Sequence, residues 1–233
     1  MRFKNLVIIG TSHIAAESVA EVAKAMQEEQ PGIVAIELDH KRLMALLHPR
    51  NAKASWKNIR SIGFKGWLFS IIGAWVEKKL GEKVGIKPGA EMLQAVKAAK
   101  ALRIPIALVD QDIEITLKRF SETLSWKEKW HLFVDVIKGL IFRRSEFSFD
   151  LSTVPSQKLI EKMIRQVRKR YPNIYRVLVT ERNQIMAKNM AHLMANNPDK
   201  KVVAIVGAGH EKELLRLVRA ELVKWGPIFR AAE

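Results

Sequence analysis

Short apolar runs, each ending at a glycine or an acidic residue, alternate along this chain with longer stretches in which apolar residues recur at helical spacing. Four of the runs are rich in β-branched residues and predict buried strands of a parallel sheet. They cover residues 6–9, 33–36, 104–109 and 202–206. This alternation is typical of an α/β fold, and we expect the first and last strands to belong to the same sheet.

Helical periodicity fills most of the remaining chain. Helices are predicted at residues 14–30, 40–47, 89–99, 113–120, 124–142, 156–170, 174–196 and 211–225, with a polar loop at 143–155. We therefore predict a single α/β domain over residues 1–233. Its core is a mostly parallel sheet, and residues 50–87 and 113–200 form mostly helical insertions in the middle of the chain.

Residues 62–76 form an apolar segment that contains Trp67, Phe69 and Trp75, and its one charged residue is Lys65. The segment is too short to span a bilayer as a simple helix. Its pattern favours a buried helix or a contact between subunits, and it leaves an interfacial helix open. The segment thus predicts two kinds of partner. One is a second copy of the chain, in a homo-oligomer formed through this segment, and the other is a membrane surface.

The composition narrows the classes of partner and of chemistry. The net charge of +16 predicts either an anionic partner or the highly charged surface seen in heat-adapted proteins. The chain lacks basic motifs interleaved with aromatic residues, which argues against sequence-specific nucleic-acid binding. It also lacks cysteine, which excludes disulfides, thiolate zinc sites and a cysteine nucleophile. No signal peptide precedes the first strand, so we expect a protein that is cytoplasmic or peripheral at the membrane.

Two Gly-x-x-His sequences follow the first and last predicted strands, and carboxylates follow the other two. The residues concerned are Gly10-Thr11-Ser12-His13, Gly207-Ala208-Gly209-His210, Glu37, Asp39, Asp110 and Asp112. Ligands of a parallel sheet bind beyond the carboxyl ends of its strands, so we expect both histidines at one such edge. Two imidazoles and a carboxylate suffice for a catalytic metal with open positions. The free N–H groups at the start of the following helices would favour an anion or a developing oxyanion.

Other common enzyme classes lack their motifs here. There is no Walker A sequence, no Gly-x-Ser-x-Gly elbow and no His-Glu-x-x-His helix. A dinucleotide fingerprint starting at Gly207 would need a third glycine where Lys212 stands. The cluster at residues 180–183 is compatible with an ordinary salt-bridged helix face, and Asp112 with a simple helix cap.

Taken in order, these motifs resemble the TraB/PrgY family, which is related to the Tiki proteases and the GumN proteins within the EreA/ChaN-like group. The likeness covers nearly the whole chain and is greatest for the archaeal branch. It rests on both Gly-x-x-His sequences, on residues 34–39 with Arg42, on residues 88–92, on residues 108–113 with 116–119, and on residues 181–183 with 186–187.

The resemblance implies roles for seven residues. His13, Glu37 and His210 match the family's motif residues and are expected to be metal ligands or catalytic. The other family-typical polar positions, which we expect to be catalytic, are Glu91, Arg119, Glu181 and Arg182.

Two departures from the family pattern stand out. The family often has arginine where this chain has Gln111. Many members also carry a hydrophobic carboxyl-terminal part, whereas this chain ends soon after Pro227, so we expect a soluble short form or a shortened piece.

Two functions are compatible with these residues. The first is a metal-dependent hydrolase of peptides in which His13, His210 and Glu37 or Glu91 bind Mn, Co or Zn. Tiki relatives are metal-dependent proteases, and bacterial TraB/PrgY proteins reduce the activity of a peptide sex pheromone, so the resemblance implies a peptide or protein substrate. The second is a protein that binds a peptide, or regulates at a membrane, without turnover. A metal-free variant of the first, in which the histidines act as base and acid, also stays open.

Overall fold

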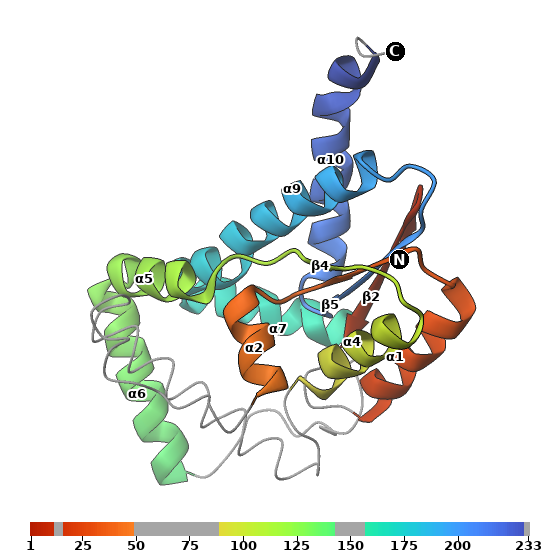
Figure 1. Cartoon of the computed structure of the whole chain (residues 1–233). Coiled ribbons are helices and arrows are strands. Elements are labelled where there is room, and N and C mark those ends of the chain that lie inside the picture. Colours follow the sequence, from red (N-terminus) through yellow and green to blue (C-terminus); the bar gives the residue numbers. More distant parts are fainter. Residues whose placement is uncertain (12–15, 49–88, 143–156, 231–233) are drawn as a thin grey trace.

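The chain folds into a sheet with helices on both faces (Figure 1). In this computed structural model the described residues are 1–11, 16–48, 89–142 and 157–230. The predicted helix at 62–76, the predicted loop at 143–155 and His13 lie outside them. No helix in these four ranges is both long enough and apolar enough to cross a membrane.

The sheet has five strands in the order β1-β2-β5-β3-β4. The strands are β1 (Arg2–Phe3), β2 (Leu6–Thr11), β3 (Ile33–Ile36), β4 (Ile106–Leu108) and β5 (Val202–Gly207). All pairs are parallel except β1 with β2. The four predicted strands and the mostly parallel α/β fold are confirmed. The short edge strand β1 was not predicted, and β4 is shorter than its apolar run.

The last strand is the central one. Strand β5 lies between β2 and β3, so that Ile205 pairs with Ile9 on one side and with Ile36 on the other. The prediction that the first and last strands share a sheet is therefore confirmed, and they are direct neighbours. As a result, the chain that leaves β5 emerges between the ends of β2 and β3.

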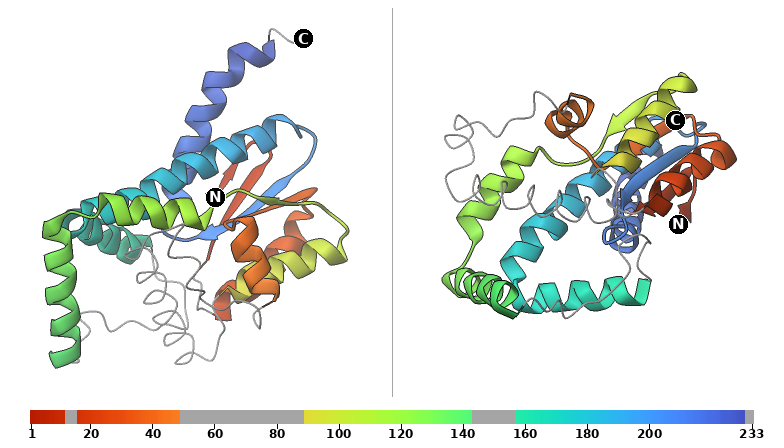
Figure 2. Two further views of the ribbon diagram at one scale, coloured as in Figure 1. Left: turned by 60° about the vertical axis from the view of Figure 1, so that its left-hand side comes forward. Right: turned by 90° about the horizontal axis from the view of Figure 1, so that it is seen from below.

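Helices cover both faces of the sheet (Figure 2). On one face, α1 (Ala16–Glu29) and α4 (Ala90–Ala101) bury their apolar residues against alternate side chains of the strands. On the other face, the same is done by α9 (Arg182–Ala195) and α10 (Glu211–Arg230). This three-layer core fixes the carboxyl edge of the sheet, where the candidate site lies.

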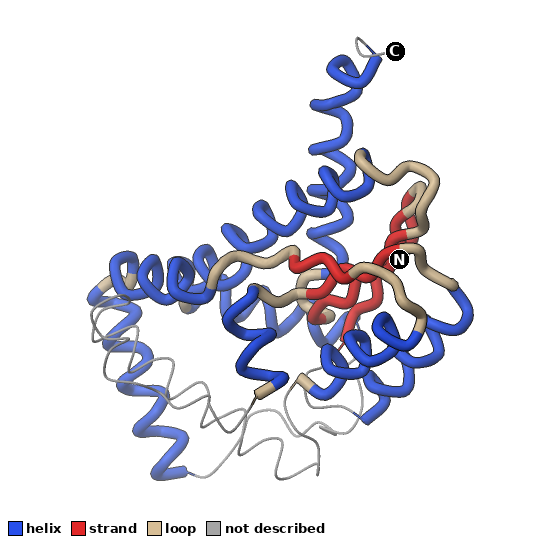
Figure 3. The backbone as a smooth tube through the Cα atoms, viewed as in Figure 1, coloured by secondary structure: helices blue, strands red, loops and turns tan. Residues whose placement is uncertain are grey.

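The remaining helices extend from this core, and α5 and α6 stand off to one side of the sheet (Figure 3). They are α2 (His40–Leu47), α5 (Ile113–Thr123), α6 (Trp126–Phe142), α7 (Gln157–Arg170) and α8 (Pro172–Tyr175). The predicted helices there agree with the structure to within a few residues. The division into one domain with helical insertions stays a prediction, although the described residues from 113 to 195 are helical apart from 124–125 and 171.

The predicted helix at 174–196 differs from the structure. It begins earlier, because Pro172 stands at the first helical position, where its missing N–H costs nothing. Its next six residues form a π-helical segment, η2 (Arg176–Glu181), before α9 begins at Arg182. π-Helical turns inside helices are rare and occur frequently at functional sites. This one ends directly before the arginine that enters the candidate site.

The buried carboxylate of Glu128 holds α6 and α8 together. It forms a capping box with Ser125 at the start of α6, and it also accepts hydrogen bonds from the backbone N–H and the side-chain Nδ2 of Asn173, at 2.7 and 2.9 Å. Burial opposes its charge, but the hydrogen bonds from Ser125 and Asn173 outweigh burial and lower the pKa of Glu128 to about 2. This contact fixes the helical extension that leads into η2 and α9.

Candidate functional site

The starts of the two Gly-x-x-His sequences lie side by side. Strands β2 and β5 pair in register up to their last residues, Thr11 and Gly207, and Ala208 N–H donates to Thr11 O at 2.8 Å. A Cβ atom at Gly10 would lie 3.1 Å from the Cα atom of Ala208. The two loops therefore leave the sheet at neighbouring points, and His210 lies within the described residues whereas His13 does not.

Glu37 stands at the end of β3, beside this point, and is buried. Its backbone N–H donates to Ile205 O at 3.1 Å, which continues the pairing of β3 with β5. Its side-chain Oε2 accepts the backbone N–H of Gly207 at 2.6 Å. The carboxylate is therefore fixed against the turn that carries the second Gly-x-x-His sequence.

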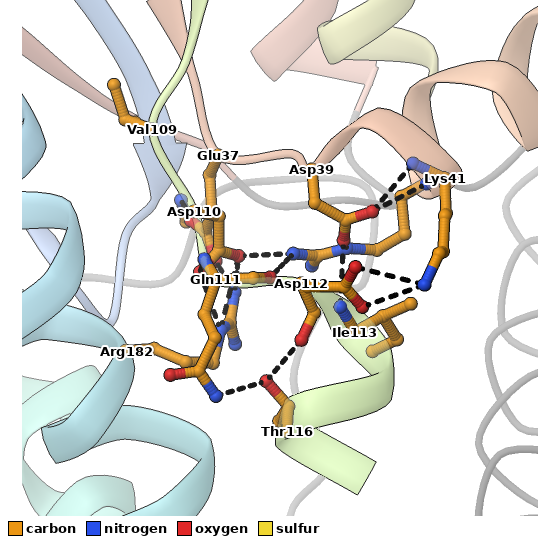
Figure 4. Close-up of polar contacts among 12 residues, drawn as sticks. Glu37, Asp39, Lys41, Val109, Asp110, Gln111, Asp112, Ile113, Thr116 and Arg182 are labelled. Atoms are coloured by element: carbon orange, nitrogen blue, oxygen red, sulfur yellow. Dashed lines mark hydrogen bonds and ion pairs between the residues drawn. The ribbon is translucent and has the colours of Figure 1, made fainter. Parts of the chain in front are cut away.

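Arg182 at the start of α9 reaches over the sheet edge and joins two buried carboxylates (Figure 4). Its Nη2 donates to Glu37 Oε1 at 2.5 Å and to Asp110 Oδ2 at 2.6 Å, and its Nε donates to Asp110 Oδ1 at 3.1 Å. Its Nη1 donates to Leu178 O, in the π-helical segment, at 3.0 Å. Burial opposes the charge of Arg182, but the charges of Glu37 and Asp110 outweigh it and hold the pKa above its usual value.

A second arginine extends this network. Arg42 on α2 donates to Asp110 Oδ2 at 2.6 Å and to Asp39 Oδ2 at 2.5 Å. Asp39 also caps α2, where it accepts the backbone N–H groups of Lys41 and Arg42. The linked network thus contains the carboxylates of Glu37, Asp39 and Asp110 and the guanidinium groups of Arg42 and Arg182.

His210 lies beside the Glu37 end of that network. Its Nε2 is 3.3 Å from Glu37 Oε1, and its Nδ1 is 2.6 Å from Oδ1 of Asn183, which is fully buried on α9. With the amide in this orientation, His210 donates its Nδ1–H to Asn183, and Nε2 faces the carboxylate. Within the described part of the chain, Asn183 Nδ2 is the one buried side-chain nitrogen that has no hydrogen-bond partner.

The pair of His210 and Glu37 fits two ligands of one metal ion. Two ligand atoms bound at about 2.1 Å to a tetrahedral ion lie about 3.4 Å apart, close to the separation of Nε2 from Oε1. The hydrogen bond from Nδ1 to a side-chain oxygen is the support that metal-binding histidines usually have. Among the described residues no third His, Asp or Glu completes such a group, so a further ligand would lie outside them.

The other predicted site residues lie at different distances from this network. Glu91 is buried in the first turn of α4. Because α4 leads into the parallel strand β4, its first turn lies at the same edge of the sheet as Glu37. Arg119 and Glu181 pair with each other on the surface, with Nη2 2.7 Å from Oε1. The ion pair between Arg119 and Glu181 lies apart from the contacts of Arg182 with Glu37 and Asp110. The catalytic role of Glu91, Arg119 and Glu181 stays a prediction.

Two further polar residues have structural contacts. Asp112 caps α5 by accepting Glu114 N–H at 2.7 Å, as its position suggested, and pairs with Lys41. Gln111 donates its side-chain Nε2 to Thr116 Oγ1 at 3.0 Å (Figure 4). Where the family often has arginine, this chain therefore has a residue that stabilises the start of α5.

Two participants, Asn183 and Arg42, were not assigned roles in the site from the sequence, whereas Asp110 was predicted at this edge as a strand-end carboxylate. Asn183 directly follows Arg182, and on a regular helix neighbours point about 100° apart, so helical spacing does not place both in one site. Arg42 follows Asp39 by three residues, which is a spacing that brings side chains together on a helix.

The chain resembles known proteins over most of its length. Residues 3–221 match the sequence model of the TraB/PrgY/gumN family. An uncharacterized protein of Methanocaldococcus jannaschii is 34% identical over 219 residues, which are 92% of this chain and 53% of that protein. TraB domain-containing proteins of Bos taurus and Homo sapiens are 26% and 25% identical over 230 residues, which are 87% of this chain and 59% and 60% of those proteins. The chain thus spans little more than half the length of these relatives. On the strength of the match over nearly all its residues, the chain belongs to the TraB/PrgY/gumN family.

Proposed function

We propose that this chain is a hydrolase that cleaves peptides at the edge of the sheet where Glu37 and His210 meet, with a divalent metal ion held by His210, Glu37 and His13. The observation that carries this proposal is the 3.3 Å approach of His210 Nε2 to Glu37 Oε1. A second hydrogen bond fixes each group: His210 bonds to Asn183, and Glu37 accepts the Gly207 N–H. A preorganised pair of this kind is what metal-assisted hydrolysis requires of the protein.

Each side chain has a task in this proposal. Asn183 fixes the orientation of the imidazole, and Arg182 holds the buried carboxylate of Glu37 in place. The ion, Mn, Co or Zn, would supply Lewis-acid chemistry, which lowers the pKa of bound water and polarises a carbonyl. We assign the acceptance of a proton from the attacking water to Glu91, the carboxylate in the first turn of α4.

The arginines are assigned to charge stabilisation. Arg182 has five N–H groups, and its contacts with Glu37, Asp110 and Leu178 within the described residues leave one at Nη1 for a developing oxyanion or a substrate carboxylate. Arg119 and Glu181, paired on the surface, would act at the outer end of a bound peptide.

The test is hydrolysis of a peptide mixture, followed by mass spectrometry, after the purified chain is loaded with Mn²⁺, Co²⁺ or Zn²⁺. We expect cleavage that His13→Ala and His210→Ala abolish. The matched control is His40→Ala, because His40 is exposed at the start of α2. Absence of cleavage with all three ions, together with absence of stoichiometric metal in the native mass spectrum, would refute the proposal. Tight peptide binding without turnover would instead support a binding protein.

One observation favours a metal-free form of the same reaction. Glu37 Oε1, the oxygen that faces His210, already accepts a hydrogen bond from Arg182. In this form His210 and His13 act as acid and base. The two forms differ in one readout, since activity in the metal-free form survives a chelator.

A further inference from the structure

Three large apolar side chains on α6 point into solvent. Trp126, Trp130 and Phe133 are 84%, 64% and 56% exposed, and we call them the aromatic stripe. Their spacing of four and three residues places them on one face of the helix. The opposite face is in contact with the rest of the chain, because Glu128 holds the start of α8 and Asp135 pairs with Tyr171 and Arg170. The stripe is therefore a surface feature of a helix whose other face is fixed.

The surroundings of the aromatic stripe are basic. Lys127 and Lys129 lie in the same turns, and Lys129 Nζ stands 4.2 Å from the ring centre of Trp126. The two acidic residues in these turns belong to the opposite face, where one is buried and the other is paired. The last turn of α7, with Arg168, Lys169 and Arg170, lies against the opposite face of α6, where Arg170 pairs with Asp135. The chain as a whole has a net charge of +16.

The charge around the aromatic stripe indicates which kind of partner would cover it. A second copy of the chain would bring the lysines and the +16 charge of one molecule against those of another. An anionic lipid surface has the complementary charge, and it accommodates tryptophan at the level of its head groups. Helices that lie in the plane of a membrane combine lysine and arginine with tryptophan and phenylalanine in this way. We propose that α6 docks the protein on an anionic membrane surface through the aromatic stripe.

The test is co-sedimentation of the full chain with vesicles of phosphatidylcholine, prepared with and without phosphatidylglycerol. We expect binding that requires phosphatidylglycerol and weakens as salt is raised. Removing an interfacial tryptophan side chain costs roughly tenfold in partitioning, so Trp126→Ala and Trp130→Ala should each reduce binding by about that factor. The matched control is Val223→Ala, which removes an exposed apolar side chain on α10, 77% exposed, and should leave binding unchanged.

A label reports which surface meets the lipid. Because the chain has no cysteine, Lys127→Cys and Lys97→Cys each accept a single environment-sensitive dye, the first beside the aromatic stripe and the second on the exposed side of α4. Vesicles should shift the emission of the dye at position 127 to shorter wavelength and leave the dye at position 97 unchanged. Circular dichroism checks that each variant is folded.

Several results would overturn the proposal. Vesicle binding that is absent, or that is the same in the tryptophan variants, would remove the lipid role of α6. Sedimentation velocity that finds a dimer lost in Trp126→Ala would identify a second copy as the occupant. Binding of an oligonucleotide that depends on Trp126, without vesicle binding, would identify nucleic acid instead. These readouts do not involve hydrolysis, so they stand apart from the proposed activity.

Discussion

Replacing Arg182 should lower the free energy of unfolding more than a substitution at the surface does, because the Arg182 side chain lies between two buried carboxylates. Arg182→Met removes the guanidinium group that the buried Glu37 and Asp110 share, although Asp110 keeps its pair with Arg42. Within the described residues Arg182 donates four hydrogen bonds to carboxylates and one to a carbonyl, and each bond to a charged group contributes about 1.5–3 kcal/mol. These contributions are not additive, and removal of one partner from a buried ion pair usually costs about 3–5 kcal/mol. We therefore expect the free energy of unfolding to fall by about 4 kcal/mol, from a typical total of about 5–15 kcal/mol.

The assay is urea unfolding followed by circular dichroism at neutral pH. The matched control is Arg119→Met, because Arg119 also forms a two-point contact with a carboxylate, that of Glu181, but on the surface. An exposed pair contributes less than about 1 kcal/mol, and the control should lose no more than that. The double variant Arg182→Met/Glu37→Gln should recover part of the loss, since it removes the charge of the carboxylate that loses its guanidinium partner, whereas Asp110 keeps Arg42. A loss below about 1 kcal/mol for Arg182→Met alone would refute the account of the network.

Three further predictions concern neighbouring contacts. Glu128→Gln should lower the free energy of unfolding at neutral pH by about 3 kcal/mol, which corresponds to the fall in the pKa of Glu128 from 4.5 to about 2. Because the pKa is lowered in the folded state, the difference from wild type should be complete above pH 4.5 and vanish as the pH falls towards 2, and a difference that persists there would contradict the assignment. Asn183→Ala should lower the free energy of unfolding by about 1–3 kcal/mol, because it removes the Oδ1 atom that accepts the Nδ1–H of His210. It should also shift His210 away from the Nδ1–H tautomer, as measured by ¹⁵N NMR, and an unchanged tautomer would contradict the contact. Gly10→Ala should destabilise the fold by about 1–3 kcal/mol in thermal unfolding, because its Cβ would lie 2.7 Å from Glu211 Oε2, and a neutral result would show that the Glu211 side chain moves aside.

The sheet and its helices follow from local pattern. Apolar runs bounded by glycine or acidic residues predicted the four parallel strands, because a strand buried on both faces has no polar positions. The placement of Gly10, Glu37 and His210 at one edge followed from the rule that parallel strands present their carboxyl ends together. The structure agrees for His210 and Glu37, whose Nε2 and Oε1 atoms lie 3.3 Å apart.

The hydrogen bonds and ion pairs within the site did not follow from local sequence pattern. The first two residues after the six-residue π-helical segment, Arg182 and Asn183, both reach the sheet edge, where they bind Glu37 and His210. Local propensity does not encode such a turn, since it is stabilised by long-range contacts such as Arg182 with Asp110. The pairing of Arg42 with Asp110 likewise joins residues far apart in sequence.

The most direct test of the proposed site is a crystal grown with Mn²⁺ and measured for anomalous scattering. We expect one strong anomalous peak beside His210 Nε2 and Glu37 Oε1, with His13 as a further ligand. The peak should be lost in His210→Ala. Both groups are positioned for it by Asn183 and the Gly207 N–H. A map without a peak at this point, with Arg182 still bound to Glu37, would contradict the metal-dependent form of the proposal.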